Sequence, residues 1–143
     1  MKLDRTDLEG LLPHRPPMLI LQEVSALEPG VSGAGSVWVG ADDPWLEGHF
    51  PGNPILPGVM IVEALAQLSA AIYITAKSEE GEGTMYLLGI DGMRFRRPVV
   101  PGDRLDLYAD ALGVRHGIWR YQCRAEVGGV KVADGILMAV VKG

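Results

Sequence analysis

The hydrophobic and polar positions divide the chain into one long apolar segment and several shorter, strand-like ones. Residues 58–77 are apolar on almost every face, which is typical of a helix buried inside a protein. The segments near 85–97, 104–114, 117–127 and 130–141 are rich in Val, Ile, Leu, Tyr and Trp, and turn sequences separate them. Because short connections join these predicted strands, we expect an antiparallel sheet.

The N-terminal part adds a short helix and two further strands. Residues 5–12 favour a helix, with Thr6 as N-cap and Glu9 completing a capping box. Residues 18–27 and 32–39 predict strands. The simplest packing is a curved antiparallel sheet of about six strands wrapped around one long buried helix, an α+β fold. Such a sheet leaves edges exposed, and pairing between subunits commonly covers them, so we expect a dimer.

Size and composition indicate a single globular domain over residues 1–143. Hydrophobic residues make up 48% and charged residues 22%, which is ordinary for a globular protein. The formal net charge of −5 disfavours a general nucleic-acid binder, because phosphate contacts need a basic face. The single cysteine, Cys123, excludes an internal disulfide and a Cys-based metal cluster, and it fits a reducing cytoplasm.

No membrane span or signal peptide is expected from the sequence. The longest apolar run, residues 59–76, is interrupted by Glu63, Gln67 and Ser69, so we do not expect it to cross a membrane. The first ten residues lack the apolar core of a signal peptide. These features predict a cytoplasmic protein.

The candidate chemistry is concentrated between His49 and Gln67. His49 stands in a loop rich in Pro and Gly, and histidine can accept a proton near pH 7. Glu63 follows fourteen residues later among apolar helix positions, where desolvation would raise its pKa and suit a proton donor. The amides of Gly58 and Val59 begin the helix, where free N–H groups can stabilise an enolate. Gln67, one turn after Glu63, would orient its carboxyl or form a core hydrogen bond.

A base, an enolate site and an acid together describe β-elimination, such as dehydration of a 3-hydroxyacyl thioester. No redox cofactor or metal is required for this chemistry. The other two histidines do not add to it: His14 is interpreted as a structural or surface residue, and His116 as an exposed turn residue. The three histidines also lack the spacing of metal ligands, so we expect no metal site.

Three motifs in order resemble one enzyme family over nearly the whole chain. They are LLPHRPPMLILQEV, EGHFPGNPILPGVMIVEALAQ and GIDGMRFRRPVVPGDRL. The chain resembles the Z-type β-hydroxyacyl-acyl-carrier-protein dehydratases of bacterial fatty-acid synthesis, which have the hot-dog fold. The resemblance implies conversion of (3R)-hydroxyacyl to trans-2-enoyl thioesters on an acyl carrier protein. It also implies a homodimer with active sites shared between subunits, which can assemble further into a hexamer.

The resemblance carries several roles over to positions of this chain. His49 and Glu63 match the catalytic pair, Gly58 matches the amide that contacts the thioester carbonyl, and Tyr86 matches a tyrosine that gates the acyl tunnel in some members. The neighbouring Phe50, Val59 and Gln67 are expected to contribute to substrate binding. Glutamate at position 63, where the A-type dehydratase/isomerase has aspartate, favours dehydration without isomerisation.

A cluster of arginines is the candidate contact with the carrier protein or its phosphopantetheine arm. It consists of Arg94, Arg96, Arg97 and Arg104. A charged strand edge that guards against aggregation explains the same cluster equally well.

Three other functions stay open at this point. They are a dehydratase of a specialised polyene or polyketide-type pathway, a hot-dog thioesterase, and a non-catalytic acyl-binding subunit.

Overall fold

The computed structural model describes residues 1–46, 49, 52–77 and 84–142. Within these residues the chain forms two helices and one six-stranded sheet. In chain order the elements are α1 (Arg5–Leu11), β1 (Glu23–Glu28), β2 (Ser32–Trp38), α2 (Gly58–Ala76), β3 (Thr84–Phe95), β4 (Arg104–Arg115), β5 (Ile118–Val127) and β6 (Val130–Lys142).

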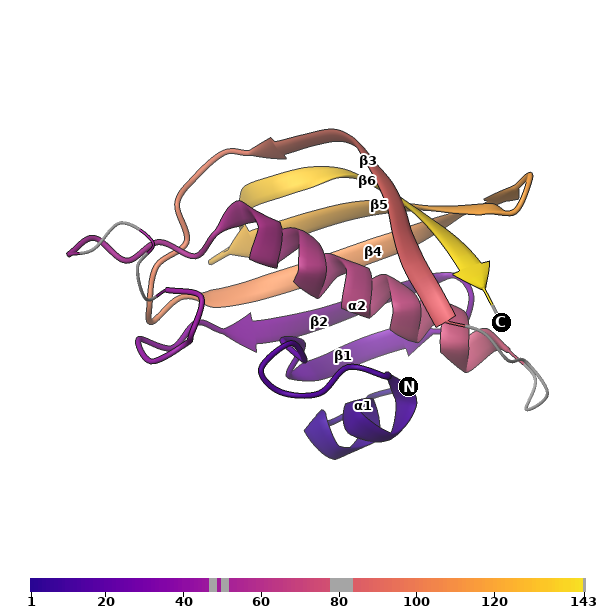
Figure 1. The fold of residues 1–143 in the computed structure, drawn as a ribbon, viewed down its shortest axis with the longest axis horizontal. Helices are drawn as coiled ribbons and strands as arrows, with labels where there is room; N and C mark the ends of the chain where they lie inside the picture. The colour runs from indigo at the N-terminus through magenta and orange to yellow at the C-terminus, as the bar shows by residue number, and fades with distance from the viewer. Residues whose placement is uncertain (47–48, 50–51, 78–83, 143) are drawn as a thin grey trace.

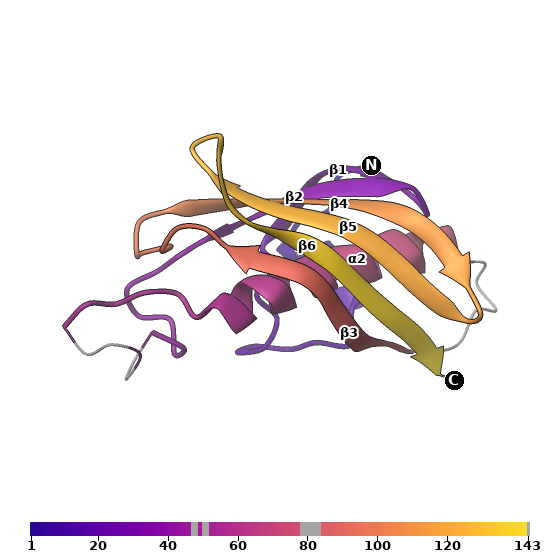
Figure 2. The same cartoon turned by 90° about the horizontal axis from the view of Figure 1, so that it is seen from above.

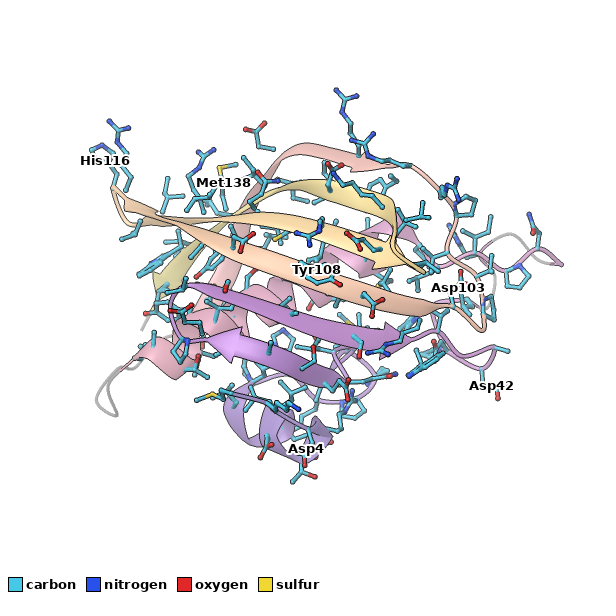
Figure 3. The ribbon with its side chains drawn as sticks, turned by 180° about the vertical axis from the view of Figure 1, so that it is seen from behind. Asp4, Asp42, Asp103, Tyr108, His116 and Met138 are labelled. Atoms are coloured by element: carbon cyan, nitrogen blue, oxygen red, sulfur yellow. The ribbon has the colours of Figure 1, made fainter. Side chains whose placement is uncertain are left out.

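The sheet has the strand order β1-β2-β4-β5-β6-β3, and every neighbouring pair is antiparallel. It curves around α2, which lies along its inner face (Figures 1 and 2). Seen from behind, the strands lie in front of α2, and Tyr108 marks the outer face of the sheet (Figure 3). This arrangement confirms the predicted hot-dog architecture and the four C-terminal strands to within a few residues.

The helix α2 is the centre of the hydrophobic core. Ten of its nineteen residues are buried, and Leu65, Leu68 and Ile72 have no exposed surface. By length and composition α2 is apolar enough to cross a membrane. In this fold its apolar surface is instead covered by the sheet, so α2 is the core helix of a globular domain.

The N-terminal region differs from the sequence prediction in two ways. The cap of α1 is Asp4, whose side chain accepts from the Asp7 N–H while Asp7 caps the Asp4 N–H in return, so Thr6 is not the N-cap. Residues 18–22 are not part of β1, because the N–H groups of Ile20 and Leu21 donate to the side chain of Gln67. A side chain from α2 thus replaces a neighbouring strand as their partner.

A close approach between β3 and β6 depends on Gly135. A Cβ atom at this position would lie 2.7 Å from Cα of Met93, next to the irregular pairing between Asp91 and Arg94. We expect Gly135→Ala to lower the free energy of unfolding by about 1–3 kcal/mol, because backbone must move to admit the methyl group. Urea unfolding measures this effect.

Gly10→Ala in α1 is the matched control for that substitution. A Cβ atom at Gly10 would have no neighbour within 4 Å, and alanine favours the helix by up to about 1 kcal/mol. A Gly135→Ala protein as stable as the wild type would contradict the tight β3–β6 contact.

Candidate active site

Two side chains contact the same oxygen of the Glu63 carboxylate. Oε1 accepts a hydrogen bond from Nε2 of Gln67 at 3.1 Å and lies 3.3 Å from Nε2 of His14. The side chain keeps 25% of its surface exposed. Burial raises its pKa, but the hydrogen bonds from His14 and Gln67 and the charge of His14 together hold the pKa of Glu63 below its usual value.

This direction corrects the expectation that desolvation alone would raise the pKa of Glu63. The two donors outweigh the effect of burial, and one of them, His14, is distant in sequence. At neutral pH Glu63 is therefore a carboxylate in this fold. It can accept a hydrogen bond from a substrate hydroxyl.

Gln67 is completely buried and uses all of its hydrogen-bonding capacity. Its Oε1 accepts from the N–H groups of Ile20 and Leu21 at 3.0 Å each, and its Nε2 donates to the carbonyl of Met18 at 2.6 Å and to Glu63. This position favours the orienting role considered for Gln67 over direct contact with an acyl chain.

The cavity beside Glu63 is mainly apolar and runs between α2 and the sheet. It has a volume of about 190 Å³, and its lining includes His14, Glu63, Ala70, Tyr86 and Leu137. Tyr86, on β3, is about half exposed and reaches this cavity from the edge of the sheet. The structure thus places the expected tunnel residue Tyr86 next to Glu63.

His49 lies at a second, more open groove of about 480 Å³. Its lining includes His49, Gly58, Val59, Phe95 and Arg97. Nδ1 of His49 lies 2.7 Å from the carbonyl oxygen of Ile55. Because a carbonyl can only accept, Nδ1 carries the hydrogen, and in the neutral ring the lone pair is on Nε2. This is the tautomer that a general base needs.

The start of α2 faces the same groove as His49. The N-cap is Pro57, which offers no side-chain hydrogen bond, and the first turn contains no acidic residue. The amides of Gly58 and Val59 therefore lie at the positive end of an uncapped helix. A Cβ atom at Gly58 would come within 2.9 Å of the Phe95 ring, so glycine lets this ring pack against the start of α2.

The predicted site residues thus form two groups in one subunit. His49, Gly58 and Val59 line one groove, whereas Glu63 and Tyr86 line the other cavity. Neither lining contains residues of both groups. Phe50, the remaining predicted substrate-binding residue, lies outside the described residues.

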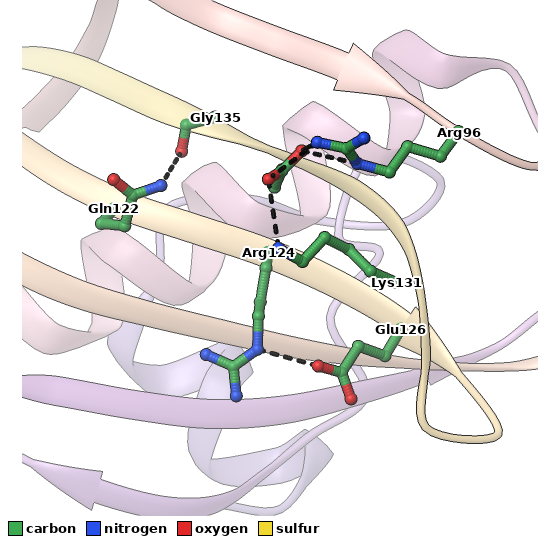
Figure 4. Close-up of polar contacts among 7 residues, drawn as sticks. Arg96, Gln122, Arg124, Glu126, Lys131 and Gly135 are labelled. Atoms are coloured by element: carbon green, nitrogen blue, oxygen red, sulfur yellow. Dashed lines mark hydrogen bonds and ion pairs between the residues drawn. The ribbon is translucent and has the colours of Figure 1, made fainter.

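Of the four predicted arginines, Arg96 and Arg97 both line the His49 groove, whereas Arg104 lies on a different strand. Arg96 forms an ion pair with Asp134, which Lys131 also contacts (Figure 4). Arg104 lies on β4 beside Asp106, three strand positions away from β3. The strand β3 ends at Phe95 after an irregular pairing, so Arg96 and Arg97 lie beyond it.

His14 is the residue that sequence reasoning missed. It was interpreted as structural or exposed, but it lines the Glu63 cavity and contacts the carboxylate. The available signal was its setting in Pro13-His14-Arg15-Pro16-Pro17, where prolines restrict the backbone on both sides. That pattern indicates a fixed histidine but does not reveal its partner.

Comparisons with known proteins identify the family of this chain. The FabA-like domain model matches residues 12–135. The 3-hydroxyacyl-[acyl-carrier-protein] dehydratase FabZ of Brucella abortus is 44% identical, over 98% of this chain and 91% of the relative. That of Anaeromyxobacter sp. is 42% identical, over 97% of this chain and 90% of the relative.

Solved structures share the fold at lower identity. A chain of the dehydratase heterocomplex ApeI:P from Xenorhabdus doucetiae superposes with a TM-score of 0.80 at 21% identity, covering 95% of this chain and 91% of that one. A hypothetical thioesterase from Streptococcus pneumoniae gives a TM-score of 0.64 at 13% identity, with 84% of each chain covered. The fold alone therefore does not separate dehydratase from thioesterase, but the sequence match does: this chain belongs to the FabZ family of 3-hydroxyacyl-acyl-carrier-protein dehydratases.

Proposed function

We propose that the chain dehydrates 3-hydroxyacyl thioesters carried on acyl carrier protein to the 2-enoyl thioesters of fatty-acid synthesis, in the cytoplasm. This is the activity named for its relatives at 42–44% identity over nearly the full chain. The observation in the structure that carries the proposal is the tautomer of His49. Its Nδ1 lies 2.7 Å from the Ile55 carbonyl oxygen, so Nδ1 carries the hydrogen and Nε2 is the basic nitrogen of the neutral ring.

The first half of the reaction uses the groove at the start of α2. Nε2 of His49 takes the α-proton, and the electron pair of the C–H bond moves into the thioester carbonyl to form an enolate. The amides of Gly58 and Val59 stabilise the negative oxygen, because they lie at the uncapped positive end of the helix.

The second half of the reaction removes the β-hydroxyl. The enolate electrons return to form the α–β double bond, and the C–O bond breaks with its electron pair on oxygen. The His49 imidazolium supplies the proton to that oxygen, so water leaves and the ring becomes neutral again. Glu63, which is ionised, accepts a hydrogen bond from the hydroxyl and holds it for departure.

A second copy of the chain is the proposed partner along β3. This strand is an edge of the sheet and exposes large apolar side chains, among them Tyr86, Leu88 and Ile90. A long apolar edge strand is unfavourable in water and is suited to pairing with an identical strand. We propose an antiparallel β3–β3 pairing that forms the homodimer, on which a hexamer can be built.

Antiparallel pairing along β3 would also complete the active site. The Glu63 cavity is lined by Tyr86, near the first end of β3, and the His49 groove by Phe95, at the other end. A two-fold axis near the middle of the strand brings the first end of one copy beside the last end of the other. Each complete site would then combine His49 of one subunit with the partner's Glu63.

The carrier protein is proposed to dock near the mouth of the His49 groove. Arg97 lines this groove and Arg94 is exposed nearby, so both are available to meet a phosphate group. Arg96 and Arg104 already have carboxylate partners within the chain, which makes them weaker candidates.

The proposed function is tested by analysing the product formed from a 3-hydroxyacyl thioester. We expect an enoyl thioester, seen by its absorbance band, with no free acid. Free acid would indicate a thioesterase, and no turnover with the carrier-bound substrate would indicate a binding subunit. Comparison of saturated and polyene-type acyl substrates would separate fatty-acid synthesis from a specialised pathway.

A further inference from the structure

The segment that carries His14 lies directly over Glu63. Nε2 of His14 is 3.3 Å from Oε1 of Glu63, and both residues line the same cavity. About a quarter of each side chain is exposed, 27% for His14 and 25% for Glu63. In such partly buried surroundings a hydrogen bond to a charged group is stronger than one on the open surface.

Both donors to Glu63 bind the same oxygen. Among the described residues, the hydrogen bonds to this carboxylate come from His14 and Gln67, and both reach Oε1. Two donors on one oxygen fix the plane of the carboxylate. Oε2 is then the oxygen available to a substrate hydroxyl in the cavity.

The backbone around His14 is held in place independently of Glu63. The Arg15 guanidinium donates to the carbonyls of Leu12 at 2.9 Å and His14 at 2.7 Å. The carbonyl of Arg15 in turn accepts from the N–H groups of Met18 and Leu19. Gln67 ties the following residues to α2, so the segment is fastened on both sides of the histidine.

The burial of Nδ1 of His14 indicates which ring nitrogen carries the hydrogen. Nδ1 is buried and has no hydrogen-bond partner among the described residues. A hydrogen on Nδ1 would be an unpaired buried donor, which is costly, whereas a hydrogen on Nε2 meets the Glu63 carboxylate. The geometry therefore favours a hydrogen on Nε2 that is donated to Glu63.

We propose that His14 is a positioning residue for Glu63, which donates its Nε2–H to Oε1 and, together with Gln67, directs Oε2 towards the substrate. This role rests on the proposed dehydratase function, in which Glu63 holds the departing hydroxyl. It adds a residue on the N-terminal segment to a site that is otherwise built from the 49–67 region and β3.

Few other ionisable groups lie around this pair. The cavity lining adds Tyr86 and Tyr121, and Arg15 follows His14 with its guanidinium on backbone carbonyls. Burial first, and then Tyr73 and Cys123, raise the pKa of Tyr121, so it stays neutral at physiological pH. A change in the titration of Glu63 on removal of His14 can therefore be attributed to that contact.

The first test uses the unchanged full-length protein. Long-range ¹H–¹⁵N NMR of the histidine rings, with His14→Gln identifying the His14 signals, reports which nitrogen is protonated. We expect the hydrogen on Nε2 of His14. A neutral ring protonated only on Nδ1 would overturn the proposal, because that tautomer cannot donate to Glu63.

The second test compares two substitutions of His14 whose side chains differ in length. The amide nitrogen of His14→Gln can lie near the position of Nε2, whereas the shorter His14→Asn cannot reach Glu63. We expect His14→Asn to lower kcat about 10- to 100-fold with little change in KM, and His14→Gln to stay within a few-fold of the wild type. Equal activity of His14→Asn and the wild type would contradict the proposed role.

Carboxyl ¹³C NMR of Glu63 tests the His14 contact without measuring enzyme activity. Its result therefore does not depend on the proposed function. In His14→Asn the pKa of Glu63 should rise towards its usual value, and in His14→Gln it should stay nearer the wild-type value. Glu63→Gln identifies the signal, and His116→Asn is a matched histidine control at an exposed turn. If the pKa of Glu63 is unchanged in His14→Asn, the contact between His14 and Glu63 is refuted, even if the enzyme is an active dehydratase. If this pKa rises, the contact is supported, even if the proposed substrate class is wrong.

Discussion

Replacement of His49 by Ala is expected to lower kcat for dehydration by about two to four orders of magnitude, the usual contribution of a positioned general base. His49 is the residue whose tautomer is fixed for proton abstraction, through the bond between Nδ1 and the carbonyl of Ile55. Alanine removes the base but leaves the helix start and the Glu63 cavity in place. The measurement is enoyl-thioester absorbance at saturating substrate.

His116→Asn is the control for the His49 substitution. His116 lies at the tip of the β4–β5 hairpin, away from the start of α2, and has a φ of 54°, which asparagine tolerates (Figure 3). It should retain wild-type kcat. A His49→Ala protein that is folded and turns over within a few-fold of the wild type would show that another group takes the α-proton.

Glu63→Gln is the second substitution with a large expected effect. The glutamine amide has nearly the same shape as the carboxylate but no charge. It therefore holds the substrate hydroxyl more weakly. It also no longer stabilises the His49 imidazolium that forms during the reaction. We expect kcat to fall about 100- to 1000-fold, comparable to the loss of one preorganised electrostatic contact. Glu28→Gln, at an exposed glutamate of β1, is the matched control. Turnover near the wild-type rate would remove Glu63 from the mechanism.

The lowered pKa of Glu63 gives this substitution a pH signature as well. A carboxyl whose pKa is lower in the folded state than in the unfolded state favours folding above its unfolded pKa. That contribution is lost as the pH falls through the folded value. Glu63→Gln should therefore narrow the difference in unfolding free energy between neutral and acidic pH. An unchanged difference would contradict the His14 and Gln67 contacts.

The parts of the fold that were predicted correctly depend on local signals. The segment 58–77 was predicted as the helix α2 because none of its faces is polar enough to be exposed to solvent. Turns at Gly102 and Gly128-Gly129 marked the ends of the last strands. Residues 18–22 looked equally strand-like. Their hydrogen bonds go to Gln67, more than forty positions away, and no local pattern contains that information.

In the candidate site, as in the fold, some features follow from residues close in sequence, whereas others depend on residues far away in the sequence. The roles of His49 and Glu63 follow from residues near them in sequence, together with the family resemblance. The sign of the Glu63 pKa shift depends on His14, forty-nine residues earlier, so a prediction from burial alone was wrong. The separation of the two groups of site residues within one chain likewise emerged only from the folded structure, in which they line different cavities.

The central claim, a dehydratase site built from two subunits, is tested most directly by combining the two inactive variants in one dimer. We would co-express His49→Ala and Glu63→Gln chains with different affinity tags, purify the mixed dimer, and measure enoyl-thioester formation. One of its two sites would contain an intact His49 and the partner's intact Glu63, so about half of the wild-type kcat per dimer is expected. Activity no higher than that of either variant alone would contradict a shared site.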